Sequence, residues 1–223
     1  MTVLAVAEHR RGDLRDVSHE LVTAGRELAD TTGGDLHVAV ISGPVEEYAD
    51  DLNRDGVDAI HTVAHGEEFN HDVYTQAVTQ LADEIEPTVL LMPQSVNGLD
   101  YAPAVANRLG RPLVTDAVGL EYDDELTVTR ELYGSKVETT LDVHADQAAV
   151  TIRPAEWPTA EGSSDAAVEP FEVSIDESAV RSTVTGFQEV SGGDVDISEA
   201  DVLVSIGRGI EEEENLDLIR DLA

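Results

Sequence analysis

Short apolar runs alternate with longer amphipathic segments through the first half of the chain. A continuously apolar run is typical of a strand buried on both faces of a sheet. Apolar residues three or four positions apart are typical of a helix packed on that sheet. Four such units in succession predict an α/β fold, with a parallel sheet covered on both faces. The predicted strands are 2–8, 36–41, 59–64 and 88–93, and the predicted helices are 14–29, 44–54, 70–85 and 99–109, with Pro103 near the first turn of the last.

The pattern changes from Pro112 onward, where runs alternate apolar and polar residues with no helical segment between them. This alternation predicts antiparallel strands that bury one face, added to the parallel sheet or forming a small ribbon beside it. These strands are 113–122, 126–133, 136–143 and 147–153; a linker at 159–167 precedes two more, 168–175 and 181–190. A second linker begins near Ser191. We therefore expect one domain at 1–190 and the beginning of another at 191–223.

Charge is the unusual feature of the composition: 47 acidic residues face 13 Lys and Arg, for a net charge of −34, and Lys136 is the only lysine. Such a field repels nucleic acid and anionic membranes. It favours a halophilic protein in a salt-rich cytoplasm, because carboxylates hold water and hydrated cations. The alternative is an acidic surface that docks a partner.

The chain has no cysteine. Disulfides, iron–sulfur clusters, thiolate zinc sites and cysteine nucleophiles are therefore excluded. The first residues lack the order of charges and the apolar length of a signal peptide, and no segment reaches the length of a membrane span. We expect a soluble cytoplasmic protein.

Three histidines, His61, His65 and His71, lie close together in the sequence. His61 is on a predicted strand, where four residues of rise separate side chains by about 13 Å. One metal ion does not bridge that distance, so ordinary surface histidines are favoured over a metal site. The remaining histidines are isolated in the sequence: His9, His19, His37 and His144.

The loop that contains Ser95 follows a predicted strand and precedes a helix, a position where α/β proteins often bind ligands. Nothing in the sequence pairs Ser95 with a base, and no hydrolase or nucleotide-binding signature is present. The loop is either an anion site at a helix N-terminus or a capped helix with Asn97 or Asp100 as the cap. The cap is favoured, because an acidic residue occupies the place that an anion would take.

The stretch VLVSIGRG at 202–209 is predicted to be a strand followed by a tight turn. It has Gly207 and Gly209, but Glu212 stands where a dinucleotide fingerprint has its third glycine. The acidic residues after it would repel a pyrophosphate. Arg208 is a cation between two glycines at the carboxyl end of a strand. Taken alone, the turn fits ligand contact and an ordinary surface turn equally.

Four runs together resemble the alpha subunit of electron transfer flavoproteins. The first is GLDYAPAVANRLGRPLVTDAVGL at 98–120, and the second is TRELYGSKVETTLDV at 129–143. The others are VTIRP at 150–154 and VSIGRGIEEEENLDLIRDLA at 204–223. The match follows the order of the family's motifs along the whole chain.

The resemblance implies a heterodimeric electron carrier, not a classical enzyme, with a beta subunit and one FAD. Electrons enter from dehydrogenases, such as the acyl-CoA dehydrogenases of fatty acid oxidation, and leave to a quinone oxidoreductase. The first domain would be a Rossmann-like three-layer sandwich of the adenine nucleotide alpha hydrolase type that docks on the beta subunit. A second, doubly wound domain would hold most of the flavin. Arg208, with Gly207 and Gly209, matches the family's arginine near the flavin.

The sequence departs from the family pattern at two positions and in extent. Leu99 stands where the family often has arginine, and Ile206 replaces a common glycine. Chains of the family continue for further residues that carry later flavin contacts, so we expect this sequence to be part of a longer polypeptide. By itself it is expected to hold FAD weakly or not at all.

Two other functions fit the same sequence. One is a stand-alone adenine-nucleotide-binding module of the stress-protein type, suggested by the parallel sheet and the loop at Ser95. The other is a docking domain without a ligand, suggested by the acidic surface.

Overall fold

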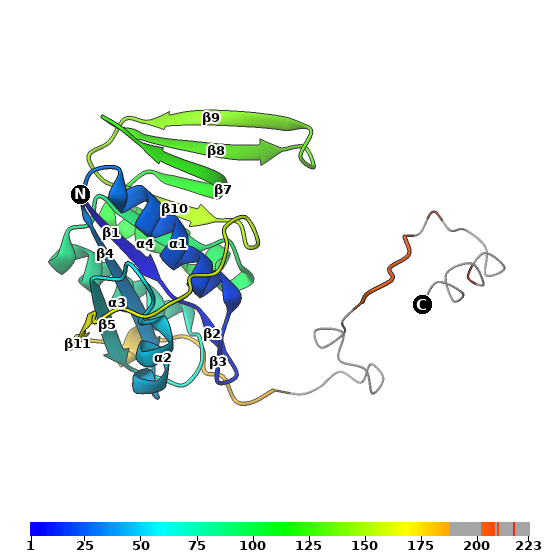
Figure 1. Cartoon of the computed structure of the whole chain (residues 1–223). Coiled ribbons are helices and arrows are strands. Elements are labelled where there is room, and N and C mark those ends of the chain that lie inside the picture. The colour runs from blue at the N-terminus through cyan, green and yellow to red at the C-terminus, as the bar shows by residue number, and fades with distance from the viewer. Residues whose placement is uncertain (188–201, 208, 210–215, 217–223) are drawn as a thin grey trace. The chain divides into compact units, whose positions relative to one another are not determined.

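The computed structural model describes residues 1–187, 202–207, 209 and 216 (Figure 1). By their contacts the residues divide into two units, Met1–Val184 and Thr185–Ala223. All of the helices and strands given below belong to the first unit. The prediction that a second domain begins near Ser191 stays a prediction, because residues 188–201 lie outside the described part.

A nine-stranded sheet forms the middle of the first unit, in the order β11-β5-β4-β1-β6-β10-β7-β8-β9 among the described residues. The strands from β11 to β7 are parallel, and β8 and β9 continue the sheet antiparallel to β7. A two-stranded ribbon, β2 with β3, lies outside it. The bounds are β1 Thr2–Val6, β2 His9–Arg10, β3 Asp13–Leu14, β4 Asp35–Ser42, β5 Ala59–Ala64, β6 Val89–Pro93, β7 Leu113–Tyr122, β8 Leu126–Leu132, β9 Val137–Val143, β10 Ala148–Ile152 and β11 Ala167–Pro170.

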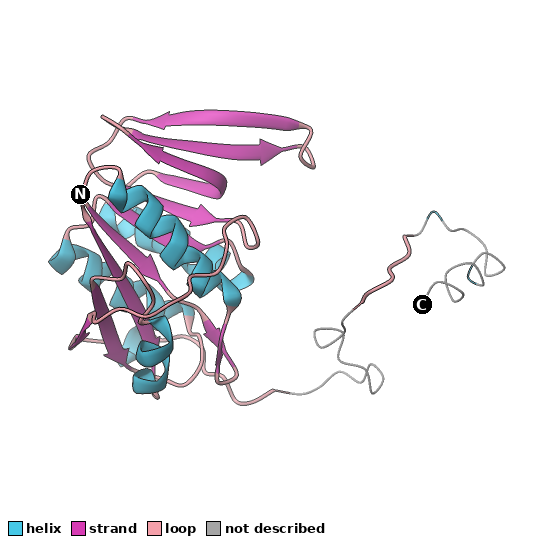
Figure 2. Ribbon diagram, viewed as in Figure 1, coloured by secondary structure: helices cyan, strands magenta, loops and turns pink. Residues whose placement is uncertain are grey.

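Helices cover both faces of the parallel sheet, which makes three layers (Figure 2). α1 and α2 pack in one core cluster, and α3 and α4 pack in the other. Successive residues of β1 point alternately to the two layers: Val3 belongs to the first cluster and Leu4 to the second. The bounds are α1 Asp16–Asp30, α2 Val45–Leu52, α3 His71–Ile85 and α4 Val96–Leu109, and a short 3₁₀ helix covers Glu177–Ala179. The predicted three-layer α/β fold with added antiparallel strands is confirmed.

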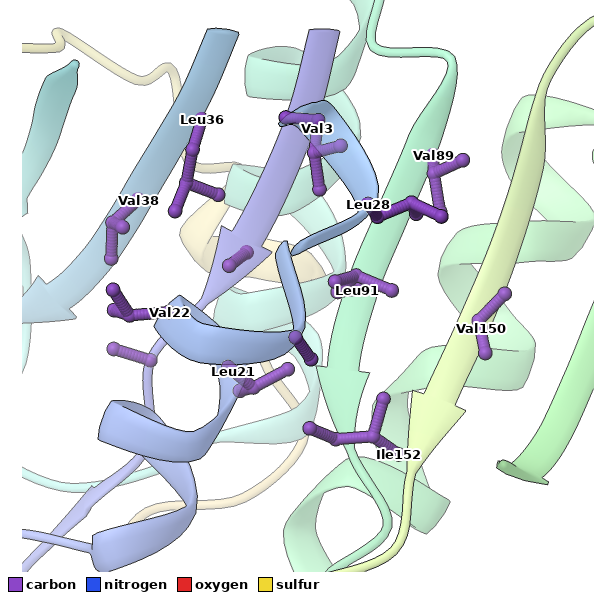
Figure 3. Close-up of a cluster of buried hydrophobic side chains, with 14 of the residues drawn as sticks. Val3, Leu21, Val22, Leu28, Leu36, Val38, Val89, Leu91, Val150 and Ile152 are labelled. Carbon is purple, nitrogen blue, oxygen red and sulfur yellow. The ribbon is translucent and has the colours of Figure 1, made fainter. Parts of the chain in front are cut away.

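The core between α1 and the sheet explains why the sequences of the central strands are continuously apolar. Leu21 and Leu28 of α1 lie over the central strands, among side chains such as Leu36, Leu91 and Val150 (Figure 3). All five are almost completely buried. Because helices cover both faces, every position of β6 and β10 is buried, and the strands lose the polar alternation of a one-sided sheet.

The expectation that residues 147–153 form an antiparallel strand is wrong. β10 lies between β6 and β7 and is parallel to both. Thr151 produced the misleading alternation, since it is a polar residue in an otherwise apolar run. The Thr151 hydroxyl donates a hydrogen bond to Gln94 Oε1 and so is satisfied inside the structure.

The two strands expected at 168–175 and 181–190 are also mostly absent. β11 ends at Pro170, and the described residues from 171 to 187 contain no strand. Phe171, Val173 and Ile175 pack against the core cluster of α3 and α4. Their alternation therefore reflects packing against the layer of α3 and α4, since residues 171–175 are not part of a strand.

Candidate functional site

The carboxyl ends of β1 and β6 are the place where this topology changes direction. From β1 the chain builds outward through β4 and β5, and it then returns to β6 on the other side of β1. Parallel α/β proteins often bind ligands in the crevice at such a point. Here Glu8 follows β1 and Ser95 follows β6, and the Ser95 hydroxyl donates a hydrogen bond to the Glu8 carboxylate. Burial raises the pKa of Glu8, although the bond from Ser95 opposes that effect.

Ser95 is also the N-cap of α4, since its Oγ accepts a hydrogen bond from the Gly98 amide at 3.0 Å. The expectation of Asn97 or Asp100 as the cap is wrong, because α4 begins at Val96 and both residues lie inside it. For the same reason Pro103 is inside the helix and not near its first turn. A Cβ on Gly98 would lie 1.7 Å from the Pro93 carbonyl oxygen, so glycine permits this close approach of α4 to β6.

A carboxylate of the protein therefore stands beside the helix N-terminus where a phosphate would sit. The Ser95 hydroxyl and the Glu8 carboxyl group are hydrogen-bonded to each other there, so neither is directed at a ligand. The geometry does not favour the adenine-nucleotide interpretation of this loop.

His9 follows Glu8 and is buried. Its Nε2 is 2.8 Å from the Ile41 carbonyl oxygen, which also accepts a hydrogen bond from the Tyr74 hydroxyl at 3.0 Å. The ring of His9 stacks on Tyr48, with centroids 4.9 Å apart. Tyr101 packs edge-on against Tyr74, and burial raises the pKa of its phenol well above the usual range. These polar rings are part of the core packing.

The three clustered histidines separate in the structure. His61 Nε2 lies 2.8 Å from His37 Nδ1, whereas His65 pairs with Glu177 and His71 with Asp100. Among the residues that the structure describes, no three His, Asp or Glu side chains are grouped to hold a metal ion. The prediction that His61 is a surface histidine is wrong, because its side chain is buried beside His37 of β4 and Glu169 of β11. Burial, followed by the neighbouring His37, lowers the pKa of His61.

The arginine of the VTIRP run follows β10 and links the end of that strand to β7 and β8. Arg153 binds Asp116 with two nitrogens, at 3.0 and 2.8 Å, and Glu131 with a third at 2.6 Å. Hydrogen bonds from Arg153 hold the pKa of Asp116 below its usual value, and they raise that of Arg153 itself. Asp116 has φ +63° at a register shift of β7. Sequence reasoning missed this group because its members are far apart in the chain.

The predicted flavin contacts are only partly within the described residues. Arg208 lies outside them. A Cβ added to Gly207 or Gly209 would meet no atom within 4 Å. The assignment of Arg208, Gly207 and Gly209 to FAD stays a prediction.

Comparison with known proteins decides the family. Residues 3–176 match the family model described as "Electron transfer flavoprotein domain". The chain belongs to the electron transfer flavoprotein family. It is 37% identical to the electron transfer flavoprotein subunit alpha of Methylophilus methylotrophus, over 99% of this chain and 70% of that protein. It is 31% identical to the alpha subunit of Thermoanaerobacterium thermosaccharolyticum, over 97% and 68% of the two chains. It is 33% identical to Protein FixB of Clostridium saccharobutylicum, over 99% and 68%.

These matches confirm the prediction of an electron transfer flavoprotein subunit related to the alpha subunits. They do not favour a stand-alone nucleotide-binding module. This agrees with the hydrogen bond between Glu8 and Ser95 at the carboxyl ends of β1 and β6. No helix in the part of the chain that the structure describes is long and apolar enough to cross a membrane.

Proposed function

We propose that this chain is the alpha-type subunit of a heterodimeric, FAD-containing electron carrier. It receives electrons from dehydrogenases, such as the acyl-CoA dehydrogenases of fatty acid oxidation, and passes them to a quinone oxidoreductase. The observation that carries this proposal is the similarity to alpha subunits along 97% or more of the chain. Glu8 and Ser95 are hydrogen-bonded to each other at the carboxyl ends of β1 and β6. This supports a scaffold role for the first unit, with no catalytic role of its own.

The two parts of the chain have different tasks in this proposal. Residues 1–190 dock on the beta-type subunit, and residues 191–223 begin the domain that holds FAD. FAD, when bound, supplies the electron-accepting and electron-releasing chemistry. Arg208 holds a fixed positive charge against a polar edge of the flavin. Gly207 and Gly209, which lack side chains, let the backbone approach it. The chain without its partner is expected to lack FAD.

The cellular setting is a further part of the proposal. A net charge of −34 and a single lysine support a halophilic protein in a salt-rich cytoplasm. Carboxylates at this density repel one another in dilute buffer, and added salt screens that repulsion. The unfolding temperature of such a protein is therefore expected to rise with KCl concentration.

The assignment of Arg208 is tested on the native heterodimer. Arg208→Ala is expected to lower flavin occupancy or to shift the flavin's reduction potential, because a cation beside the ring is lost. Arg108→Ala, which removes an exposed arginine from α4, is the matched control and should change neither. If occupancy and potential are the same in both variants and in the unaltered protein, Arg208 does not contact FAD.

A further inference from the structure

Two histidines and a glutamate form a row across three neighbouring strands. His37 is on β4, His61 is on β5 and Glu169 is on β11. Glu169 is the register partner of His61, and His37 is two positions before Ala39, the partner of His61 on β4. Residues two positions apart on a strand point to the same side. The three side chains therefore lie on one face of the sheet.

The two imidazole rings of this row meet nitrogen to nitrogen. His37 Nδ1 lies 2.8 Å from His61 Nε2, and the ring planes differ by 26°. His61 is 6% exposed, and His37 is partly buried. At this distance one nitrogen must donate a proton that the other accepts. The contact therefore needs one proton between these two nitrogens, and it cannot persist when both rings are positively charged, because both nitrogens then carry a proton.

Glu169 faces the other nitrogen of His61. Its Oε2 is 3.6 Å from His61 Nδ1, which is close enough for an ion pair but longer than a hydrogen bond. The side chain of Glu169 is 57% exposed, which leaves it room to move closer. If His61 takes up a proton while His37 is charged, it loses its contact with His37 and gains an ion pair with Glu169.

The charged groups that act on His61 are on the two strands beside it, His37 on β4 and Glu169 on β11. Burial, followed by repulsion from His37, lowers the pKa of His61 below 6.5, and Glu169 opposes this shift. Because the folded pKa is the lower one, the neutral form of His61 contributes stability above 6.5, and that contribution is lost as the pH falls. The direction agrees with the geometry, in which a proton on His61 breaks the contact with His37.

We propose that His37, His61 and Glu169 form a pH-sensitive switch, in which His61 exchanges a contact with β4 for a contact with β11. At neutral pH His61 is uncharged and bonded to His37. In acid both rings are charged, His37 turns toward solvent and His61 pairs with Glu169. β11 is at one end of the strand order and all of its residues are exposed (Figure 1). Residues 171–182 follow it directly, so the switch makes the attachment of this segment to β5 depend on pH.

Two double-mutant cycles on the full chain test the exchange, with urea unfolding measured at about pH 8 and about pH 5 in the same KCl concentration. The first combines His37→Leu with His61→Leu, and the second combines His61→Leu with Glu169→Gln. At the higher pH the first coupling should favour folding by about threefold to tenfold in the equilibrium constant, the worth of one hydrogen bond, and the second should be below about twofold. At the lower pH the first coupling should vanish or change sign, and the second should rise to about threefold or more.

A second measurement needs no change at a buried position. The Phe171 amide, directly after β11, donates a hydrogen bond to the Thr62 carbonyl oxygen at 2.8 Å, so its hydrogen exchange reports the attachment of β11 to β5. After correction for the intrinsic rate, this amide should exchange about threefold more slowly in acid than at neutral pH, by the gain of the ion pair. Glu169→Gln should remove the difference. Glu172→Gln, which alters an exposed carboxylate three residues further on, is the matched control and should keep it.

The order in which the two rings become charged is read from the imidazole nitrogen shifts in an NMR titration of the unaltered chain. His37 should gain its charge at a higher pH than His61, because the contact tolerates a proton on the outer nitrogen of His37 and does not tolerate a second proton on His61.

Opposite pH dependences of the two couplings support the switch. A coupling between His61 and Glu169 that is equal at both pH values would overturn it, since no contact is then exchanged. A coupling between His37 and His61 that persists in acid would overturn it as well, because the pair would then be a permanent contact. If the His61 variants do not fold, the Phe171 amide decides, and an exchange rate that does not respond to pH, or that responds equally in Glu169→Gln, shows that the proposal is wrong.

Discussion

Replacing Asp72 with asparagine is expected to weaken the hydrogen bonds that hold residues 171–182 against α3. We call residues 171–182 the strap. It runs along α3 and is held by side chains at four-residue spacing on that helix. Gln80 and Gln76 accept hydrogen bonds from the Ser174 and Asp176 amides, at 2.9 and 2.8 Å. Asp72 accepts from the Arg181 amide at 2.8 Å and from the Arg181 guanidinium at 2.7 Å.

The contribution of Asp72 follows from its pKa, which the hydrogen bonds from Arg181 lower from 3.8 to about 2. This difference corresponds to about 2.4 kcal/mol of stability. Arg181 is 73% exposed, and solvent screening reduces the contribution to about 1–2 kcal/mol. Because the folded pKa is the lower one, this stability is fully present above about pH 4 and is lost as the pH falls through about 2.

A double-mutant cycle with Asp72→Asn and Arg181→Gln isolates the pair from other effects of each change. Urea unfolding is followed by the fluorescence of Trp157, the only tryptophan, which packs against the core of α1. The expected coupling at pH 7 is about 1–2 kcal/mol, and it should shrink toward zero near pH 2. The control is Glu125→Gln with His144→Gln, an exposed pair that should couple by less than about 0.5 kcal/mol.

A coupling below about 0.3 kcal/mol at pH 7 would refute this reasoning, since it is within the error of additive sites. Coupling of the expected size that persists unchanged at pH 2 would also refute it. In that case the interaction would not depend on the charge of Asp72.

Three further predictions concern the core, the first turn of α4 and the buried His61. Leu91→Ala should destabilise the protein by about 2–5 kcal/mol in urea unfolding, because Leu91 is fully buried between the helix layers; a loss below about 1 kcal/mol would contradict that packing. Gly98→Ala should lower the unfolding temperature by several degrees, since the new Cβ would overlap the Pro93 carbonyl oxygen, and an unchanged temperature would show that α4 is not seated so close to β6. Stability should fall as the pH drops below 6.5, because the folded state disfavours a proton on His61; His61→Gln should reduce that fall, and an equally steep fall in the variant would assign it to other groups.

The elements of the first half could be predicted from the sequence because their signals are local. α3 has Asn70 as its cap, apolar residues at four-residue spacing and Pro87 beyond its end, and the structure confirms the helix at His71–Ile85. The strand at 59–64 is confirmed in the same way. Periodicity and capping depend on neighbours in the chain, which a single sequence contains.

The parts that could not be predicted depend on partners distant in the chain. The order of β6, β10 and β7 is not encoded in the local pattern of 147–153, which one polar residue made ambiguous. The strap resembles a strand in the sequence because an alternating segment packs on a helix as well as on a sheet. The bond between Glu8 and Ser95 joins residues 87 positions apart, so no local pattern could show that the loop at Ser95 lies against a carboxyl group.

The function proposed for this chain is that of the alpha-type subunit of a flavin-containing electron carrier. The most direct measurement is to purify the native protein from its source in concentrated salt, to identify every subunit by mass spectrometry and to record the visible spectrum. We expect a yellow complex of two different chains whose flavin is reduced by a dehydrogenase substrate in the presence of that dehydrogenase. A colourless protein without a second subunit would contradict it.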